Sequence, residues 1–109
     1  MEGLISGNKR TYEDFKKQLP PQIKPLFDDL RDYCFSLGKN VVEDVRMHRI
    51  VFGKSMTFRF FVDIEPQRDS VLIKIRRDRK EPLRKIDIKP NEDLNQIKTL
   101  IIEAYSNIR

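Results

Sequence analysis

Three segments of the chain, residues 56–65, 71–76 and 84–89, carry the side chains best suited to binding a nucleic acid. In each segment apolar and polar residues alternate, which is the pattern of β-strands with one buried and one exposed face. If Phe60 and Ile73 face the core, the residues between the apolar positions face outward. The outward set is then Arg59, Phe61, Lys74, Arg76, Lys85 and Lys89.

An aromatic ring among cations on an open sheet face is an arrangement that stacks unpaired bases. Each stack is worth about 1–3 kcal/mol, and the surrounding cations neutralise phosphates. We therefore expect Phe61 to stack and the cations to bind the backbone. The predicted nucleic-acid site is Arg59, Phe61, Lys74, Arg76, Arg77, Arg79 and Lys85. The alternative interpretation packs Phe61 under the N-terminal helix or in a dimer interface and leaves the cations solvated.

No combination of residues predicts a catalytic or metal site. His48 is the only histidine, and the single cysteine, Cys34, falls on the apolar side of a predicted helix, where a thiol is inert. A magnesium-dependent nuclease site would need an acid two residues before Lys74, but Leu72 stands there. The remaining strand acids are Asp63, Glu65 and Asp87. They alternate with cations, which predicts cross-strand ion pairs.

Composition sets the class of protein. The chain has 109 residues, 36% of them charged, and a formal net charge of +5. This length predicts one α+β domain over residues 11–109, preceded by a flexible arm over residues 1–10. No apolar run approaches the roughly 20 residues of a membrane-spanning helix, and the N-terminus lacks the apolar core of a signal peptide. The expected location is therefore the cytoplasm, without a membrane partner or a cofactor.

Amphipathic segments predict the helices. Across residues 22–37 the apolar side chains recur every three or four positions, and Gly38 follows as an expected left-handed C-terminal cap. Thr11 is expected to cap a shorter helix that ends before Pro20. A last helix is expected to begin with Asn91 as its N-cap.

The fold class follows from the order of these elements. Residues 41–45 and 48–52 predict short strands before the three alternating segments, and the short loops predict antiparallel neighbours. Both longer helices have one apolar face, so they bury it best on the same face of the sheet. We expect an α+β two-layer sandwich, with an antiparallel sheet of three to five strands in meander. N- and C-terminal helices pack on one face and leave the other open.

The pattern resembles a known family. It consists of a helix ending in Leu37-Gly38, the strand Val42-Glu43-Asp44-Val45, an aromatic strand running into a hairpin, and a closing helix with Glu92-Asp93-Leu94 and Glu103-Ala104-Tyr105. In these features residues 22–108 resemble the domain-of-unknown-function family numbered 5655. The resemblance implies a small α+β domain of unassigned activity, found alone or attached to predicted nucleases and other DNA-handling proteins. It supplies no functional residues.

The sequence thus predicts a small basic binding module rather than an enzyme. We expect it to contact DNA or RNA through the exposed sheet face, as an accessory to an enzyme that handles nucleic acid. The alternative is a protein-interaction or homodimerisation domain that uses the same face, or an unpaired sheet edge, without binding nucleic acid.

Overall fold

The protein forms a five-stranded antiparallel sheet whose strands follow one another in chain order. The structure is a computed structural model that describes residues 10–55, 59–77, 80 and 82–108. The strands are β1 (Val41–Val45), β2 (Ile50–Lys54), β3 (Arg59–Pro66), β4 (Val71–Ile75) and β5 (Arg84–Ile88). Each strand pairs with the next through an antiparallel ladder, so the sheet is a simple meander.

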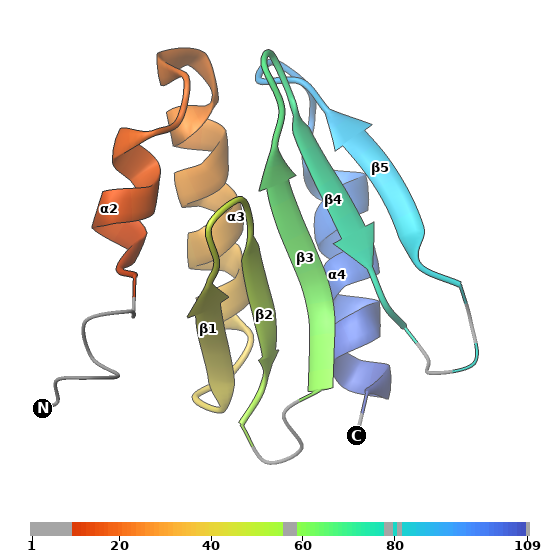
Figure 1. The fold of residues 1–109 in the computed structure, drawn as a ribbon. Coiled ribbons are helices and arrows are strands. Elements are labelled where there is room, and N and C mark those ends of the chain that lie inside the picture. The colour runs from red at the N-terminus through yellow and green to blue at the C-terminus, as the bar shows by residue number, and fades with distance from the viewer. Residues whose placement is uncertain (1–9, 56–58, 78–79, 81, 109) are drawn as a thin grey trace, which may run out of the picture.

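The helices form a second layer behind the sheet. They are α2 (Tyr12–Lys17), the short 3-10 helix η1 (Pro21–Ile23), α3 (Lys24–Ser36) and α4 (Asn95–Asn107). Figure 1 shows α3 and α4 on the same side of the sheet, with α2 packed beside α3. This arrangement confirms the predicted α+β sandwich, and none of these helices lies on the opposite side of the sheet.

The core lies between these two layers. Ile50, Ile64, Ile73 and Ile86 form one row across four strands, and the row packs against apolar side chains of the helices. Leu30 of α3 is fully buried there. Removing such side chains from water is the main favourable contribution to folding.

Both longer helices, α3 and α4, begin later in the chain than predicted, and the shift is larger for α4. α4 starts at Asn95, because Lys89 and Glu92 close a turn in which each backbone N–H bonds to the other residue. Asp93 accepts a hydrogen bond from the Asn95 N–H at 3.0 Å. The prediction that Asn91 caps the helix is therefore wrong. Thr11 does cap α2, since its hydroxyl accepts the Asp14 N–H at 3.1 Å.

Gly38 is a glycine for a different reason from the one predicted. Its backbone is not in the left-handed region, so the expected cap conformation is absent. Instead, the Tyr105 hydroxyl fills the space that a Cβ atom would need. That hydroxyl donates a hydrogen bond to Asn40 Oδ1 at 2.6 Å. Gly38 thereby allows α4 to approach the α3–β1 connection closely.

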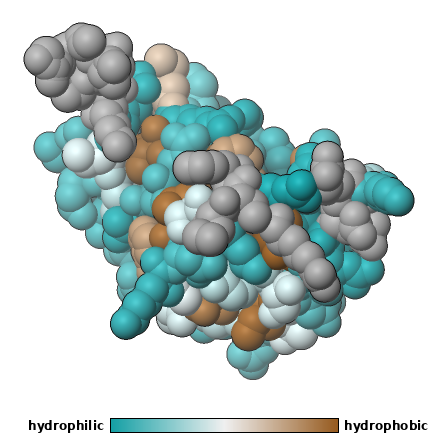
Figure 2. All heavy atoms as spheres, turned by 90° about the horizontal axis from the view of Figure 1, so that it is seen from below, coloured by the Kyte–Doolittle hydropathy of each residue, from teal (hydrophilic) through white to brown (hydrophobic). Residues whose placement is uncertain are grey.

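The surface at the lower end of the molecule is mostly polar. Figure 2 shows hydrophobic residues there as small separate patches among hydrophilic ones. Among the helices within the described residues, none has the length and apolar character that crossing a lipid bilayer requires. The predicted arm lies outside the described residues except for Arg10, which is exposed.

Candidate nucleic-acid interface

The sheet has one face covered by helices and one face that no helix of the described residues covers, which we call the open face. Cross-strand partners share a face, and successive residues alternate. Since the isoleucine row faces the helices, the adjacent row of cross-strand partners faces the other way. That row is Val51, Asp63, Lys74 and Lys85. The open face therefore contains Lys74 and Lys85, two of the cations predicted to bind nucleic acid.

The predicted site residues of β4 and β5 come together on the open face. Lys74 pairs with Lys85, and Arg76 continues the alternation of Lys74 just after β4. Arg77 is exposed immediately beyond. Arg79 lies outside the described residues.

Arg59 and Phe61 were predicted to face outward from the sheet, and a β-bulge in β3 makes that prediction wrong. Val62 pairs with Phe52 and Phe60 pairs with Gly53, so Phe61 is an extra residue with no partner in β2. The extra residue resets the alternation. Phe61 is fully buried, and its ring meets Tyr105 of α4 edge-on with centroids 5.4 Å apart.

Arg59 follows the same shift. It pairs with Lys54, whose ammonium lies 4.3 Å from the centre of the Tyr105 ring and donates to the Ile108 carbonyl at 2.8 Å. Both contacts are on the helix side of the sheet. Arg59 therefore belongs to the covered side and does not join Lys74 and Arg76.

Phe60 takes the position that was predicted for Phe61. Its side chain is 39% exposed, and the Arg46 guanidinium lies over its ring at 5.2 Å from the centroid. Gly53 provides the room, because a Cβ there would stand 3.1 Å from Phe60 Cδ1. Two sequence signals could have revealed the bulge: three consecutive apolar residues, Phe60-Phe61-Val62, and a glycine in the neighbouring strand.

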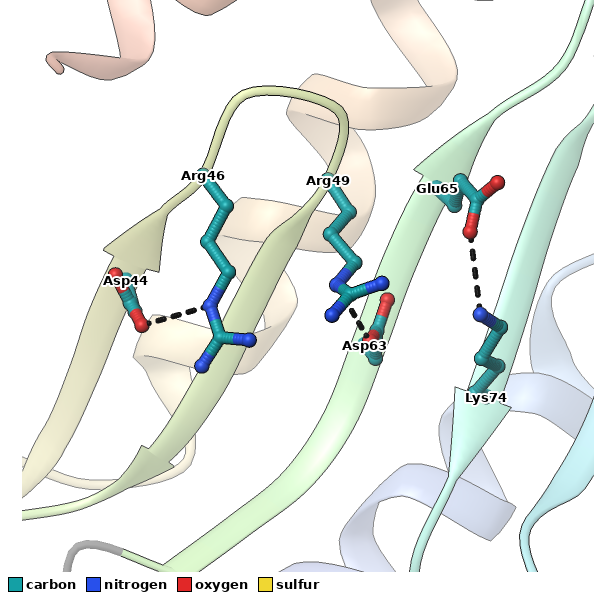
Figure 3. A network of polar contacts seen from close by, with 6 residues as sticks. All are labelled: Asp44, Arg46, Arg49, Asp63, Glu65 and Lys74. Atoms are coloured by element: carbon teal, nitrogen blue, oxygen red, sulfur yellow. Dashed lines mark hydrogen bonds and ion pairs between the residues drawn. The ribbon is translucent and has the colours of Figure 1, made fainter.

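Three ion pairs lie side by side on the open face, and Figure 3 shows their six side chains in front of the sheet with the helices behind. The pairs are Arg46 with Asp44 at 3.0 Å, Arg49 with Asp63 at 3.3 Å, and Lys74 with Glu65 at 3.1 Å. The pairing of Glu65 with a strand lysine was predicted. The two arginines of the β1–β2 connection were missed, because the expected ligand surface began only at β3.

Asp63 is the least well satisfied member of this group. Its Oδ1 atom is buried and accepts no hydrogen bond from the described residues, and Arg49 Nε likewise lacks a well-aligned acceptor. Burial raises the pKa of the Asp63 carboxyl above its usual range, and Arg49 and Lys74 offset this only in part. The open face thus contains a carboxylate oxygen that can accept a further hydrogen bond.

A hollow of about 110 Å³ lies beside Phe60. Phe60 and Leu83 belong to its apolar wall, and Asp63, Lys74 and Arg76 to its polar wall. One planar ring is enough to fill a space of this size. With Arg46, which also lines it, the hollow places an aromatic ring, a carboxylate and three cations around one small ligand position.

The sequence matches one family model over residues 12–107, that of the family described as Domain of unknown function (DUF5655). The chain belongs to this family. The matched range runs from the first residue of α2 to the last residue of α4, so it includes the whole open face. No curated protein and no solved structure matches the chain.

This DUF5655 domain also contains a larger groove of about 480 Å³ at the other end of the sheet. It lies between the β1–β2 turn and the β3–β4 turn, beyond Ile50 and Ile64, which are the last pair of the β2–β3 ladder. Met47, His48 and Arg68 line it from these turns, above apolar residues of the α2–η1 segment. Among the described residues that line it, Glu65 is the only acid, and it already pairs with Lys74. The groove contains other polar side chains, those of Gln18, His48, Gln67 and Arg68. Unlike the hollow, it has no buried polar side-chain atom that lacks a hydrogen-bond partner in the part of the chain that the structure describes.

The structure of this DUF5655 domain also locates Cys34 and the acids that were considered for catalysis and metal binding. Cys34 is fully buried in α3, and burial raises the pKa of its thiol to about 12, which confirms its predicted place in the core. Within the same residues, no three His, Cys, Asp or Glu side chains are grouped closely enough to hold a metal ion.

Proposed function

We propose that this domain is a non-catalytic module that binds nucleic acid through its open face, as an accessory to an enzyme that acts on DNA or RNA. The observation that carries the proposal is Phe60, an exposed ring on an uncovered β-sheet among Arg46, Lys74 and Arg76. Sheet faces with aromatic and cationic side chains are suited to stacking bases while neutralising the backbone.

The charges on this face support contacts with phosphates. Arg76 and Lys85 have no side-chain partner among the described residues, so they are available to a ligand without breaking an ion pair. Lys74 and Arg46 already pair with acids and would contribute less. The chain as a whole carries a net charge of +5, which favours approach of a polyanion. In this proposal Phe60 stacks, and Arg76 and Lys85 contact phosphates.

A titration of fluorescent oligonucleotides tests the proposal. Fluorescence anisotropy should show binding to the wild-type protein, and the double variant Arg76→Glu, Lys85→Glu should bind much more weakly. The control is Arg10→Glu with Lys17→Glu, which makes the same change in net charge away from the sheet and should bind better than the open-face variant. Equal loss in the two double variants would contradict a binding site on this face.

The same face also supports a second proposal, a protein partner or a second copy of the chain. Val42, Phe60 and Leu83 are all more than a third exposed, and exposed apolar side chains on one face are a feature of protein interfaces. Sedimentation at increasing concentration separates the two proposals. A dimer that Phe60→Ala dissociates, together with no oligonucleotide binding, would favour the protein interface.

A further inference from the structure

The hollow beside Phe60 has the chemistry to distinguish one base from another, an inference that rests on the proposed function. Its apolar lining includes Phe60 and Leu83, and its polar lining is Asp63 with the cations Arg46, Lys74 and Arg76. A planar ligand that lies against Phe60 therefore points its edge at a carboxylate and at cations. A ligand that fits both must carry hydrogen-bond donors next to an acceptor.

The carboxylate can accept donors that the protein does not provide. Asp63 Oδ2 contacts Arg49 Nε at 3.3 Å, whereas Oδ1 has no hydrogen-bond partner in the described structure. An ionised carboxylate accepts several hydrogen bonds through its two oxygens. Oδ1 has almost no exposed surface, so a ligand reaches it by displacing the long side chains around the hollow. Such rotamer changes are common when a ligand binds.

The cations of the hollow supply hydrogen-bond donors beside the carboxylate acceptor. Lys74 is opposite Asp63 in the β3–β4 ladder, and Arg76 lines the same hollow. Lysine and arginine are the side chains most often found on the O6 and N7 acceptors of guanine. The carboxylate and these cations therefore match a base whose donors and acceptors are adjacent.

We propose that the hollow receives one unpaired guanine of a single-stranded nucleic acid. The ring stacks on Phe60, the N1–H and N2 amino groups donate to Asp63, and O6 accepts from Lys74 or Arg76. Guanine alone has two neighbouring donors beside an acceptor on this edge. Adenine and cytosine place an acceptor nitrogen next to their amino group, and uracil places carbonyls on both sides of its one N–H. A duplex hides this edge of the base, so the ligand is a single strand.

Changing the ligand tests this without altering the protein. Six-nucleotide uridine strands with one central guanosine, inosine or adenosine are compared by fluorescence anisotropy, as RNA and as the matching DNA with thymidine. Inosine lacks only the N2 amino group, so we expect about tenfold weaker binding than with guanosine, and adenosine to bind more weakly still. The same guanosine within a hairpin stem should bind at least tenfold more weakly. Free guanosine monophosphate should bind far more weakly than the strand.

Two variants locate the effect in the protein. Asp63→Asn should abolish the preference for guanosine over inosine and leave the binding of the other strands nearly unchanged or stronger. Asp87→Asn removes the same charge from the same face of the sheet, outside the hollow and without touching its lysine or arginine, and should keep the preference. Circular dichroism shows whether Asp63→Asn is folded, and the inosine comparison decides the question if it is not.

The possible outcomes separate this inference from the proposed function. Equal binding of guanosine, inosine and adenosine strands would overturn the guanine site and leave a module without base preference. A guanosine preference that survives in folded Asp63→Asn would place recognition elsewhere. A mononucleotide that binds as tightly as the strand would overturn the single-strand ligand. No binding to any oligonucleotide would overturn both proposals.

Discussion

Phe60 and Phe61 are chemically identical neighbours in opposite environments. The bulge buries Phe61 against Tyr105 and exposes Phe60 beside Arg46. Because the two side chains have the same size and lie in the same strand, truncating each of them measures its environment directly. A regular strand would instead have buried Phe60 and exposed Phe61.

We expect Phe61→Ala to lower the free energy of unfolding by about 3–5 kcal/mol, as truncation of a buried phenylalanine does. Phe60→Ala should change it by about 1 kcal/mol or less while weakening oligonucleotide binding. Urea denaturation followed by circular dichroism measures the stability of both variants, and anisotropy measures binding by Phe60→Ala. Comparable losses of stability in the two variants would mean that β3 has no bulge at this point.

Alternation in the sequence correctly predicted the facing of most strand residues, including Ile64, Ile73 and Lys74, because one face of each strand is apolar. It failed only where an extra residue shifts the strand by one position. A bulge depends on how two strands pair, and the pairing is a property of the folded sheet rather than of one segment. The open-face ion pair of Arg49 with Asp63 also depends on pairing, since it joins the β1–β2 hairpin to β3.

At the scale of elements, the short helix α2 is held by polar contacts as well as by apolar packing. The Tyr12 hydroxyl and the Lys16 ammonium both donate to Asp28 of α3 at 2.7 Å. Arg31 lies 4.2 Å from the centre of the Tyr12 ring and pairs with Glu43 of β1 at 2.6 Å. A chain of side chains thus joins α2 to α3 and α3 to the edge of the sheet.

The Asp28 contacts predict a stability that falls in acid. Burial alone would raise the pKa of the Asp28 carboxyl, but the hydrogen bonds from Lys16 and Tyr12 outweigh it and lower the pKa below its usual range. A carboxyl with a lowered pKa in the folded state stabilises the protein above its unfolded pKa, near 3.9. That contribution is lost as the pH falls through the folded pKa.

Asp28→Asn should therefore be less stable than the wild type at pH 7, and the difference should shrink as the pH falls below about 4. Urea midpoints measured from pH 7 to pH 2 test this. Asp29→Asn is the matched control, because Asp29 is exposed on the same helix and has no side-chain partner among the described residues. A difference between wild type and Asp28→Asn that stays constant with pH would contradict the role of the ionised carboxylate.

The two structured glycines that allow close approach differ in what blocks a larger residue. A Cβ on Gly53 would stand 2.7 Å from the Arg59 carbonyl oxygen, which is backbone at the bulge. A Cβ on Gly38 would meet the Tyr105 hydroxyl and would stand 2.9 Å from Asn40 Oδ1, both at the ends of side chains. Backbone must move in the first case, whereas side chains can move aside in the second.

Gly53→Ala should accordingly lower the free energy of unfolding by about 1–3 kcal/mol, in the range of overpacked sites. Gly38→Ala should cost less, about one hydrogen bond or 0.5–1.5 kcal/mol. Its cost should be smaller in a Tyr105→Phe background, which lacks the hydroxyl but keeps the contact with Asn40. Thermal or urea denaturation of Gly53→Ala, Gly38→Ala, Tyr105→Phe and the double variant measures these effects. A Gly38→Ala cost that is undiminished in Tyr105→Phe would show that the hydroxyl is not the main obstacle.

The sequence predicted the meander, the two layers and the shared helix face because these depend on apolar periodicity, which is local to each segment. It misplaced the start of α4, where the Lys89–Glu92 turn competes with the helix for the same backbone groups. It also assigned Gly38 to a local cap, although the contact that requires glycine comes from Tyr105, 67 positions further along the chain. Long-range contacts of this kind leave no periodic signal.

At the scale of the whole molecule, the open face is cationic but largely balanced within itself. Asp44, Asp63 and Glu65 each pair with a cation of the same face, so much of its positive charge is already neutralised. Acids on this face keep phosphate contacts few, which limits affinity for any polyanion. Arg76 and Lys85 remain as the cations without a side-chain partner in the described structure.

This balance predicts how binding responds to salt. Each phosphate contact on a single strand contributes a slope of about −0.7 in a plot of log K against log salt concentration. With only a few contacts, we expect a wild-type slope of about −1.4 to −2.1, corresponding to roughly two to three phosphates. The variant Asp44→Asn, Glu65→Gln releases Arg46 and Lys74, so it should bind an oligonucleotide more tightly and with a steeper slope. Anisotropy titrations between 50 and 300 mM salt, roughly the range over which such contacts are resolved, measure both quantities.

The control Asp14→Asn, Glu13→Gln makes the same charge change on α2, and it should raise affinity less and leave the slope unchanged. If the two double variants had the same slope, the released cations would not reach phosphates, and the strand would have to bind elsewhere on the molecule.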